Sequence, residues 1–200
     1  DEALTARHVQ LSTTSELLHH LIYENNHPPL YYLLLRAWTS VFGVSEFSLR
    51  GLSCLFSCLS IPVLYFAAKR ISGSKAALIA TAIFSTSLYQ IWFAQEAKGY
   101  SLSILLTCGL LWLISCNTSE PSIRKNTLLG LLGILLFFTH YLCVLVFLPW
   151  GLFSVYTMIR TKEVVRSGFI PLVLSSGVAG FWMILFGREI HQGASQLWFP

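Results

Sequence analysis

The stretch His27-Pro28-Pro29-Leu30-Tyr31-Tyr32 separates two unlike parts of the chain. Before it lies a polar segment that opens on Asp1-Glu2, and after it nearly every segment is apolar. Two consecutive prolines remove two backbone donors, fix two φ angles and push the preceding His27 toward an extended conformation. Because proline is well tolerated in the first turn of a helix, we predict a helix that starts at Pro28-Pro29 and ends near Gly43.

The composition indicates a membrane protein. Only 11% of the residues are charged, whereas soluble domains have about a quarter. A membrane-spanning helix needs roughly 20 mostly apolar residues; the first, second and last of the chain's apolar runs meet this length, and the middle three are short. The runs are Leu49–Ala68, Ala76–Phe93, Leu102–Ser115, Leu128–His140, Leu142–Tyr156 and Phe169–Phe186. We therefore expect an all-α, polytopic membrane protein.

We divide the chain into three parts. Residues 1–48 are predicted to form a first extracytoplasmic loop with interfacial helices. Residues 49–187 would hold about six transmembrane helices, and residues 188–200 would begin a further extracytoplasmic loop. The chain has no initiator methionine and no leading apolar segment, so we expect a fragment that lacks its first membrane helix.

The positive charges predict the topology, because lysine and arginine are enriched in cytoplasmic loops. They gather at Lys69-Arg70 with Lys75, at Arg124-Lys125 and at residues 160–166. These three loops lie on one side only if Pro29–Gly43 does not cross the membrane. Its aromatic residues suit a helix that lies in the outer interface. The net positive charge then reflects membrane topology, and we expect no nucleic-acid partner.

The remaining polar clusters are predicted to meet on the outer side. They are Asp1-Glu2, Glu24–His27, Glu96–Tyr100, His140-Tyr141 and Arg188–His191. Ionisable residues at the membrane edge are costly and are therefore candidates for function. Two candidate residues each have a second interpretation. Arg50 either snorkels to lipid phosphates or holds an anionic ligand. His140 is either a structural residue or part of the site.

Two clusters suggest specific chemistry. The Asp1-Glu2 pair could supply a general base or a metal ligand, although two ordinary loop acids would look the same. Glu96 and Lys98 lie beside Tyr100, and a lysine neutralises phosphate as a point charge. This second cluster indicates a site for a phosphorylated, lipid-linked ligand.

Other chemistry-bearing residues favour simpler interpretations. The five cysteines lie mostly in apolar runs without metal or disulfide spacing, so we expect small buried side chains. Adjacent histidines such as His19 and His20 point to different faces of a helix, which favours a solvated face over a metal site. The sequence contains no Gly-rich phosphate loop and no zinc-finger spacing.

The order of these motifs resembles the dolichyl-phosphate-mannose-protein mannosyltransferase-like group, glycosyltransferase family 39. This group includes protein O-mannosyltransferases and bacterial aminoarabinose transferases. The motifs that carry the resemblance are Asp1-Glu2, His27–Tyr32, Phe42–Glu46 with Arg50, Gln95–Tyr100 and His140-Tyr141. The resemblance covers essentially the whole chain, as the N-terminal half of the family's membrane domain. It implies a GT-C-type helical bundle with juxtamembrane helices in the first outer loop.

The resemblance also implies roles for individual residues. The catalytic residues would be Asp1 as the base, with Glu2 beside it. The substrate-binding residues would be His27, Arg50, Glu96, Lys98, Tyr100, His140 and Tyr141, with Arg188 as a weaker candidate. Many bacterial members have arginine where this chain has Lys98. Some relatives hold a metal through a carboxylate just before the two prolines, but Asn26 stands there, so we expect no required cofactor and keep a divalent metal as the alternative.

The function implied by the resemblance is that of a membrane glycosyltransferase. Such an enzyme moves a sugar from a polyprenyl-phosphate donor, with inversion, to a hydroxyl of a lipid, glycan or protein acceptor. The site would lie on the extracytoplasmic face of a multi-pass cell-membrane protein, among membrane lipids. Two other classes stay open: a transporter or flippase, which predicts charges along a pathway through the membrane and repeat symmetry, and a non-catalytic membrane scaffold.

Overall fold

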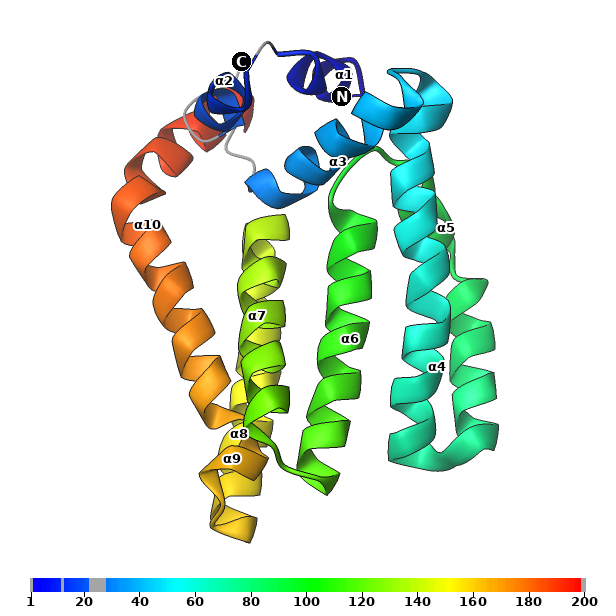
Figure 1. Ribbon diagram of the computed structural model, residues 1–200, viewed down its shortest axis with the longest axis vertical. Helices are drawn as coiled ribbons and strands as arrows, with labels where there is room; N and C mark the ends of the chain where they lie inside the picture. Colours follow the sequence, from blue (N-terminus) through cyan, green and yellow to red (C-terminus); the bar gives the residue numbers. More distant parts are fainter. Residues whose placement is uncertain (1, 12, 22–27, 199–200) are drawn as a thin grey trace.

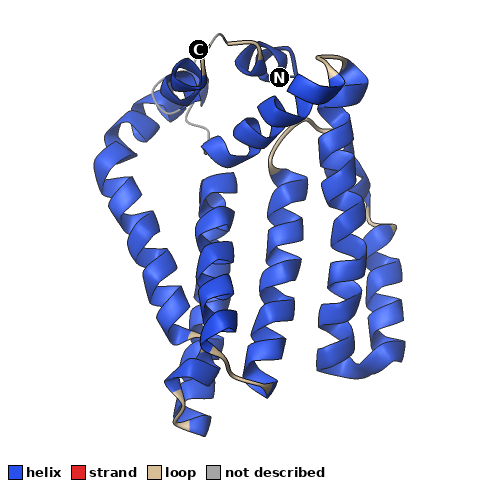
Figure 2. Ribbon diagram, in the orientation of Figure 1, coloured by secondary structure: helices blue, strands red, loops and turns tan. Residues whose placement is uncertain are grey.

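The chain is helical throughout the part that the structure describes (Figure 2). This computed structural model describes residues 2–11, 13–21 and 28–198, of which residues 2–4, 8 and 188–198 are described by their backbone alone. Helices account for 89% of the described residues, which contain no strand. The predicted all-α class is therefore confirmed.

The elements follow one another with short connections. They are α1 (Glu2–Val9), α2 (Thr14–His19), α3 (Pro29–Phe42), α4 (Glu46–Ser85), α5 (Leu88–Gln95), α6 (Tyr100–Ser119), α7 (Ile123–Thr139), the 3-10 helix η2 (Tyr141–Val146), α8 (Phe147–Thr161), α9 (Val164–Ser167) and α10 (Phe169–Trp198). The predicted apolar runs lie largely in these helices, but Ala76–Phe93 crosses the break between α4 and α5, and Leu128–His140 ends one residue past α7.

Helix α4 is a hairpin and not one straight rod. Its two arms run in opposite directions and meet at Gly73 (Figure 1). Gly73 has a φ of 81°, which a residue with a side chain rarely adopts. Helix α5 continues the direction of the second arm after a break at Thr86.

Several helices can cross a membrane. By length and composition, four stretches among the described residues are suitable: Glu46–Ser85, Tyr100–Ser119, Tyr141–Thr161 and Phe169–Gly187. The first of them contains both arms of the α4 hairpin. The structure is therefore that of a polytopic helical membrane protein, with its helices arranged up and down (Figure 1).

The bundle has two unlike ends. Helices α1, α2 and α3 lie at one end, which we call the α3 end, together with the connections that follow α5 and α7 (Figure 1). The α4 turn, the α6–α7 connection and α9 lie at the opposite end. We call this the basic end, because it carries Lys69-Arg70, Lys75, Arg124-Lys125 and residues 160–166. The basic loops that the sequence places on one side therefore lie together at one end of the bundle.

Helix α3 confirms the predicted helix and its start at the proline pair. Pro28 is its N-cap, and it ends at Gly43, whose φ of 76° requires a glycine-like conformation. The helix lies across the ends of the long helices and does not run parallel to them (Figure 1). Tyr31, Tyr32 and Leu35 are buried on the face that it turns to the bundle.

The buried apolar side chains form two clusters. The first joins the short helices of the α3 end to α4 and α6 through residues such as Leu17, Leu35 and Leu52. The second joins α6, α7, α8 and α10 around Phe137 and Trp150. The first cluster positions α3 on the bundle, and the second holds the C-terminal half together.

Helices α7 and α10 approach closely at Gly133. A Cβ atom there would lie 2.5 Å from Ser175 Oγ and 3.1 Å from the Trp150 ring. Ser175 is fully buried and donates a hydrogen bond to Gly130 O at 3.1 Å. Small residues permit this kind of close packing between membrane helices.

We expect Gly133→Ala to destabilise the protein by about 1–3 kcal/mol, because the new methyl group must displace buried atoms. The measurement is the thermal unfolding midpoint of the intact protein in detergent. Gly177→Ala is the matched control, since no atom lies within 4 Å of its added Cβ. Equal midpoints for the two variants would contradict the close approach of α7 and α10.

Candidate functional site

A chain of two hydrogen bonds, one buried and one partly buried, joins three segments at the α3 end. Tyr31 Oη of α3 lies 2.8 Å from Ser53 Oγ of α4. Ser53 Oγ donates to Lys98 O in the α5–α6 connection at 3.4 Å. The Tyr31 hydroxyl therefore donates to Ser53. We call these three residues the Tyr31 clamp.

The clamp holds the α5–α6 connection against α3 and α7. A Cβ atom on Gly99 would lie 3.0 Å from Thr139 O and 3.4 Å from Tyr31 Cβ. Only a residue without a side chain fits this space without displacing the backbone of Thr139. The connection is therefore fixed both by the hydrogen bonds at Lys98 and by the close packing at Gly99.

This arrangement brings two predicted substrate-binding residues together. The Tyr100 and His140 rings have centroids 5.5 Å apart, and the Phe93 ring lies 4.8 Å from Tyr100 on its other side. We call these three residues the ring stack. It places the start of α6 beside the end of α7, although the two positions are distant in the sequence.

His140 is held in one orientation. Its Nδ1 accepts a hydrogen bond from the Leu142 N–H at 3.2 Å, so a neutral ring carries its proton on Nε2. Burial lowers the pKa of His140 from its ordinary value. At neutral pH the imidazole is therefore uncharged, with Nε2–H as a hydrogen-bond donor.

Tyr32 connects the same region to α1. It is 6% exposed and shares a side-chain hydrogen bond with Thr5. Burial raises the pKa of the Tyr32 phenol, and the neighbouring Tyr31 and Tyr100 raise it further. Tyr32 therefore stays protonated, and its proximity to Tyr100 extends the ring-lined region toward the N-terminal helices.

The two charged residues of the α5–α6 connection have different surroundings. Trp92 Nε1 donates to Glu96 Oε1 at 2.8 Å, which orients the carboxylate toward α5. Lys98 Nζ lies 6.0 Å from the centre of the Tyr100 ring, a distance suited to a cation–π contact. Both side chains are half-buried. Lys98 thus supplies a positive charge next to the ring stack.

Arg50 lies at a neighbouring cleft. Its guanidinium is 2.9 Å from Glu46 Oε1, one turn earlier in α4. Both residues line a cleft of about 1190 Å³ between the first arm of α4 and α5. Ala94 and Gln95 line it too, and they immediately precede Glu96. The α5 residues that line the cleft therefore lead directly into the connection that carries Lys98.

A polar contact inside this cleft region was not predicted. Gln90 of α5 is 4% exposed, and its Nε2 lies 2.7 Å from Ser57 Oγ and 3.0 Å from Ser60 Oγ. Together with Ser53, these serines follow helical spacing of four and three residues within one apolar run. That spacing is the signal that could have identified a polar face on α4.

The other predicted residues do not join the ring stack. Tyr141 packs 5.5 Å from the Phe137 ring and faces the Trp182 indole, but neither its hydroxyl nor the indole N–H makes a hydrogen bond of good geometry among the described residues. Asp1 and His27 lie outside the described residues, and so do the side chains of Glu2 and Arg188. Among the side chains that are described, no three His, Cys, Asp or Glu residues are placed to hold a metal ion.

The fold and this site define a polytopic helical membrane protein with a polar, ring-lined region at one end of its bundle. Residues 26–185 match the dolichyl-phosphate-mannose-protein mannosyltransferase family, and the chain belongs to it. The predicted family resemblance is confirmed.

One relative and the search of solved structures complete the comparison. An uncharacterized protein from Aquifex aeolicus (strain VF5) is 28% identical over 177 residues, which are 84% of this chain and 34% of that protein. The chain therefore spans about a third of the length of this relative. No solved structure matches the chain.

We expect Tyr31→Phe to lower the free energy of unfolding by about 0.5–1.5 kcal/mol, because it removes one buried hydrogen bond of the Tyr31 clamp. Ser53→Ala should cost about 1–3 kcal/mol, since it removes both the hydrogen bond from the buried Tyr31 hydroxyl and the one to Lys98 O. The measurement is denaturation of the intact protein in detergent. The double variant should cost less than the sum of the two single variants.

Tyr89→Phe is the control for the clamp, because Tyr89 is 77% exposed. A loss of stability equal to that of Tyr31→Phe, or additive effects of Tyr31→Phe and Ser53→Ala, would contradict a direct interaction between the two hydroxyl groups.

The lowered pKa of His140 predicts a pH dependence of stability. As the pH falls below about 6.5, the unfolded chain takes up the proton before the folded protein does, so stability decreases. We expect His140→Gln to flatten this decrease in unfolding experiments between neutral and acidic pH. Tyr100→Phe keeps the ring stack and should keep the wild-type slope. An unchanged slope in His140→Gln would contradict the assignment of this dependence to His140.

Proposed function

We propose that the chain forms part of a membrane glycosyltransferase that uses a polyprenyl-phosphate sugar as donor. Family membership supports this class, and one observation of the site carries the proposal. Lys98, Tyr100 and His140 lie together at the α3 end, held there by the Tyr31 clamp. A cation beside stacked rings suits a ligand that has both a phosphate and a sugar.

The neighbouring cleft suits the lipid part of such a donor. Its lining includes apolar side chains such as Phe47, Leu55 and Ile61, with Arg50 near the start of α4. An isoprenoid chain would lie along the apolar residues, and its phosphate would lie between Arg50 and Lys98. Because Lys98 lies beside the ring stack, we assign the larger share of the phosphate interaction to Lys98.

The proposed chemistry is a single in-line displacement at the anomeric carbon. Asp1 removes the proton from the acceptor hydroxyl while the new bond from oxygen to carbon forms. The bond from the anomeric carbon to the phosphate oxygen breaks, and its electron pair leaves with the polyprenyl phosphate, so the configuration inverts. Cations near the phosphate stabilise the charge that develops there. Neutral His140 would donate its Nε2–H to a sugar oxygen.

The remaining assignments belong to the same proposal. Catalysis would take place on the extracytoplasmic face of the cell membrane, because the α3 end lies opposite the basic end. The acceptor would be a hydroxyl of a lipid, a glycan or a protein. Independence from metal remains a prediction, since the side chains of Asp1, Glu2 and His27 lie outside the described residues.

The test is sugar transfer by the intact protein from a panel of polyprenyl-phosphate sugars. We expect Lys98→Ala to raise the KM for the donor about tenfold or more, because it removes a charge from the phosphate site, and Lys98→Arg to restore donor binding. Asp1→Asn should reduce kcat about 100-fold to 10,000-fold, as expected for loss of a general base.

Lys75→Ala is the matched control, since Lys75 follows Gly73 by two residues and so lies in the α4 turn at the basic end. Wild-type transfer by Asp1→Asn would exclude Asp1 as the base. Transport of the donor without transfer would favour the alternative of a transporter or flippase.

A further inference from the structure

A second pocket lies far from the candidate functional site, toward the basic end. It has a volume of about 460 Å³, within the range of about 300–1,000 Å³ that is usual for ligand sites. The α4 hairpin contributes Arg70 and Ile71, and α6 contributes residues from Leu110 to Ser119. Residues from Val146 to Phe153 close the remaining side. We call it the basic-end pocket.

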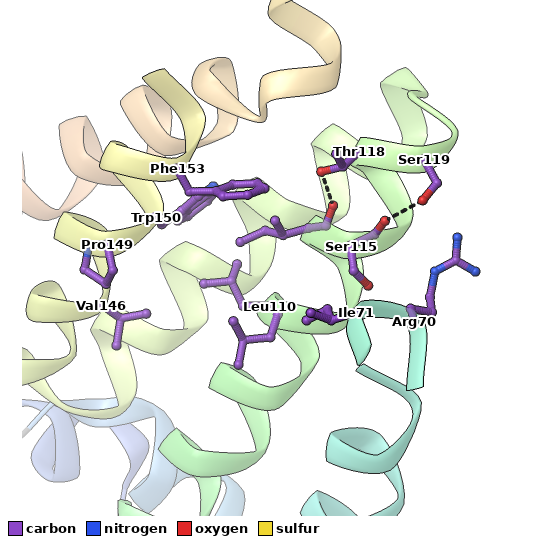
Figure 3. Close-up of a pocket in the computed structure, with 12 residues that line it drawn as sticks. Arg70, Ile71, Leu110, Ser115, Thr118, Ser119, Val146, Pro149, Trp150 and Phe153 are labelled. Atoms are coloured by element: carbon purple, nitrogen blue, oxygen red, sulfur yellow. Dashed lines mark hydrogen bonds between the residues drawn. The ribbon is translucent and has the colours of Figure 1, made fainter. Parts of the chain in front are cut away.

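The pocket has an apolar wall and a polar rim. Figure 3 shows Trp150, Phe153, Pro149 and Val146 on one side, and Arg70 with two serines on the other. The residues of the apolar wall belong to α6 and to the η2–α8 stretch. Both segments are long and apolar enough to cross a membrane. The pocket therefore extends from the end of the bundle into the depth of the hydrocarbon.

The rim offers one cation and several acceptors. Ser115 Oγ donates to Trp112 O at 2.7 Å, and Ser119 Oγ donates to Ser115 O at 3.1 Å. Because each hydroxyl proton is used within α6, the remaining lone pairs accept hydrogen bonds from a ligand. Arg70 is exposed, and no described carboxylate lies within ion-pair distance of it.

Arg70 is the charged residue among those that line the pocket. None of the lining residues is acidic. The nearest acids along the chain have partners of their own: Glu120 pairs with Lys125 at 3.3 Å, and Glu163 pairs with Arg166 at 3.1 Å. An anionic head group would therefore meet Arg70 without an opposing carboxylate.

We propose that the basic-end pocket binds an anionic glycerophospholipid whose head group carries hydroxyl groups, of the phosphatidylglycerol type. One acyl chain lies against Trp150 and Phe153, the phosphate pairs with Arg70, and the head-group hydroxyls donate to Ser115 and Ser119. The depth of the pocket selects a lipid over a soluble anion, and its position at the basic end matches the anionic leaflet. The inference does not depend on the proposed transfer reaction.

The test uses the intact protein in detergent, titrated with phosphatidylglycerol or with phosphatidylcholine of identical chains, and native mass spectrometry to count bound lipid. We expect wild type to prefer phosphatidylglycerol and Arg70→Gln to bind it about fivefold more weakly, as estimated from about 1 kcal/mol per basic residue near anionic lipid. Ser115→Phe should fill the pocket and lower the binding of both lipids.

Lys75→Gln is the matched control, because Lys75 lies near the same hairpin turn but does not line the pocket. We expect it to bind phosphatidylglycerol as the wild type does. Equal binding of the two lipids by wild type, or equal losses in Lys75→Gln and Arg70→Gln, would overturn the proposal. Unchanged binding by Ser115→Phe would overturn the location, and competition by free glycerol phosphate at lipid concentrations would overturn the lipid as occupant.

Discussion

The hydrogen bonds from Tyr31 through Ser53 to Lys98 O are the contact on which the α3 end depends. They tie a helix, a spanning arm and a connection whose positions in the sequence are far apart. Each bond contributes only about 0.5–1.5 kcal/mol net, but an unpaired buried group costs more. Alternative placements of α3 would break the bonds, so the contact selects one arrangement. The α5–α6 connection that this contact holds leads directly into Tyr100, which stacks between Phe93 and His140.

The same kind of contact recurs throughout the bundle. Gln90 joins α5 to the serines of α4, and Asn117 and Asn126 both donate to Val165 O at 2.8 Å near the basic end. Ser175 joins α10 to Gly130. In a membrane, apolar contacts between helices differ little from contacts with lipid, so polar bonds and small residues contribute to the choice of partner helix. These few side chains therefore specify which helices are neighbours.

The two ends of the bundle suit different ligands. The α3 end combines a cation with rings and hydrogen-bond donors, which fits a sugar phosphate, and the cleft beside it fits a lipid tail. The basic end combines a pocket with several arginines and lysines, which fits a lipid of the anionic leaflet.

The sequence by itself determined the helical membrane class, the helix that begins at Pro28-Pro29 and ends at Gly43, and the separation of the basic loops from the other polar clusters. Length, hydropathy, proline geometry and charge are local or additive properties, so a single chain reveals them. It also marked Lys98, Tyr100 and His140 individually. Only the tertiary structure decided that Tyr100 stacks on His140, that Tyr141 instead packs against Phe137, and that Arg50 lies beside a cleft with Glu46. The stacking of Tyr100 on His140 and the cleft beside Arg50 depend on how distant segments meet, and Ser53 and Gln90 become informative only when the helices that carry them face each other.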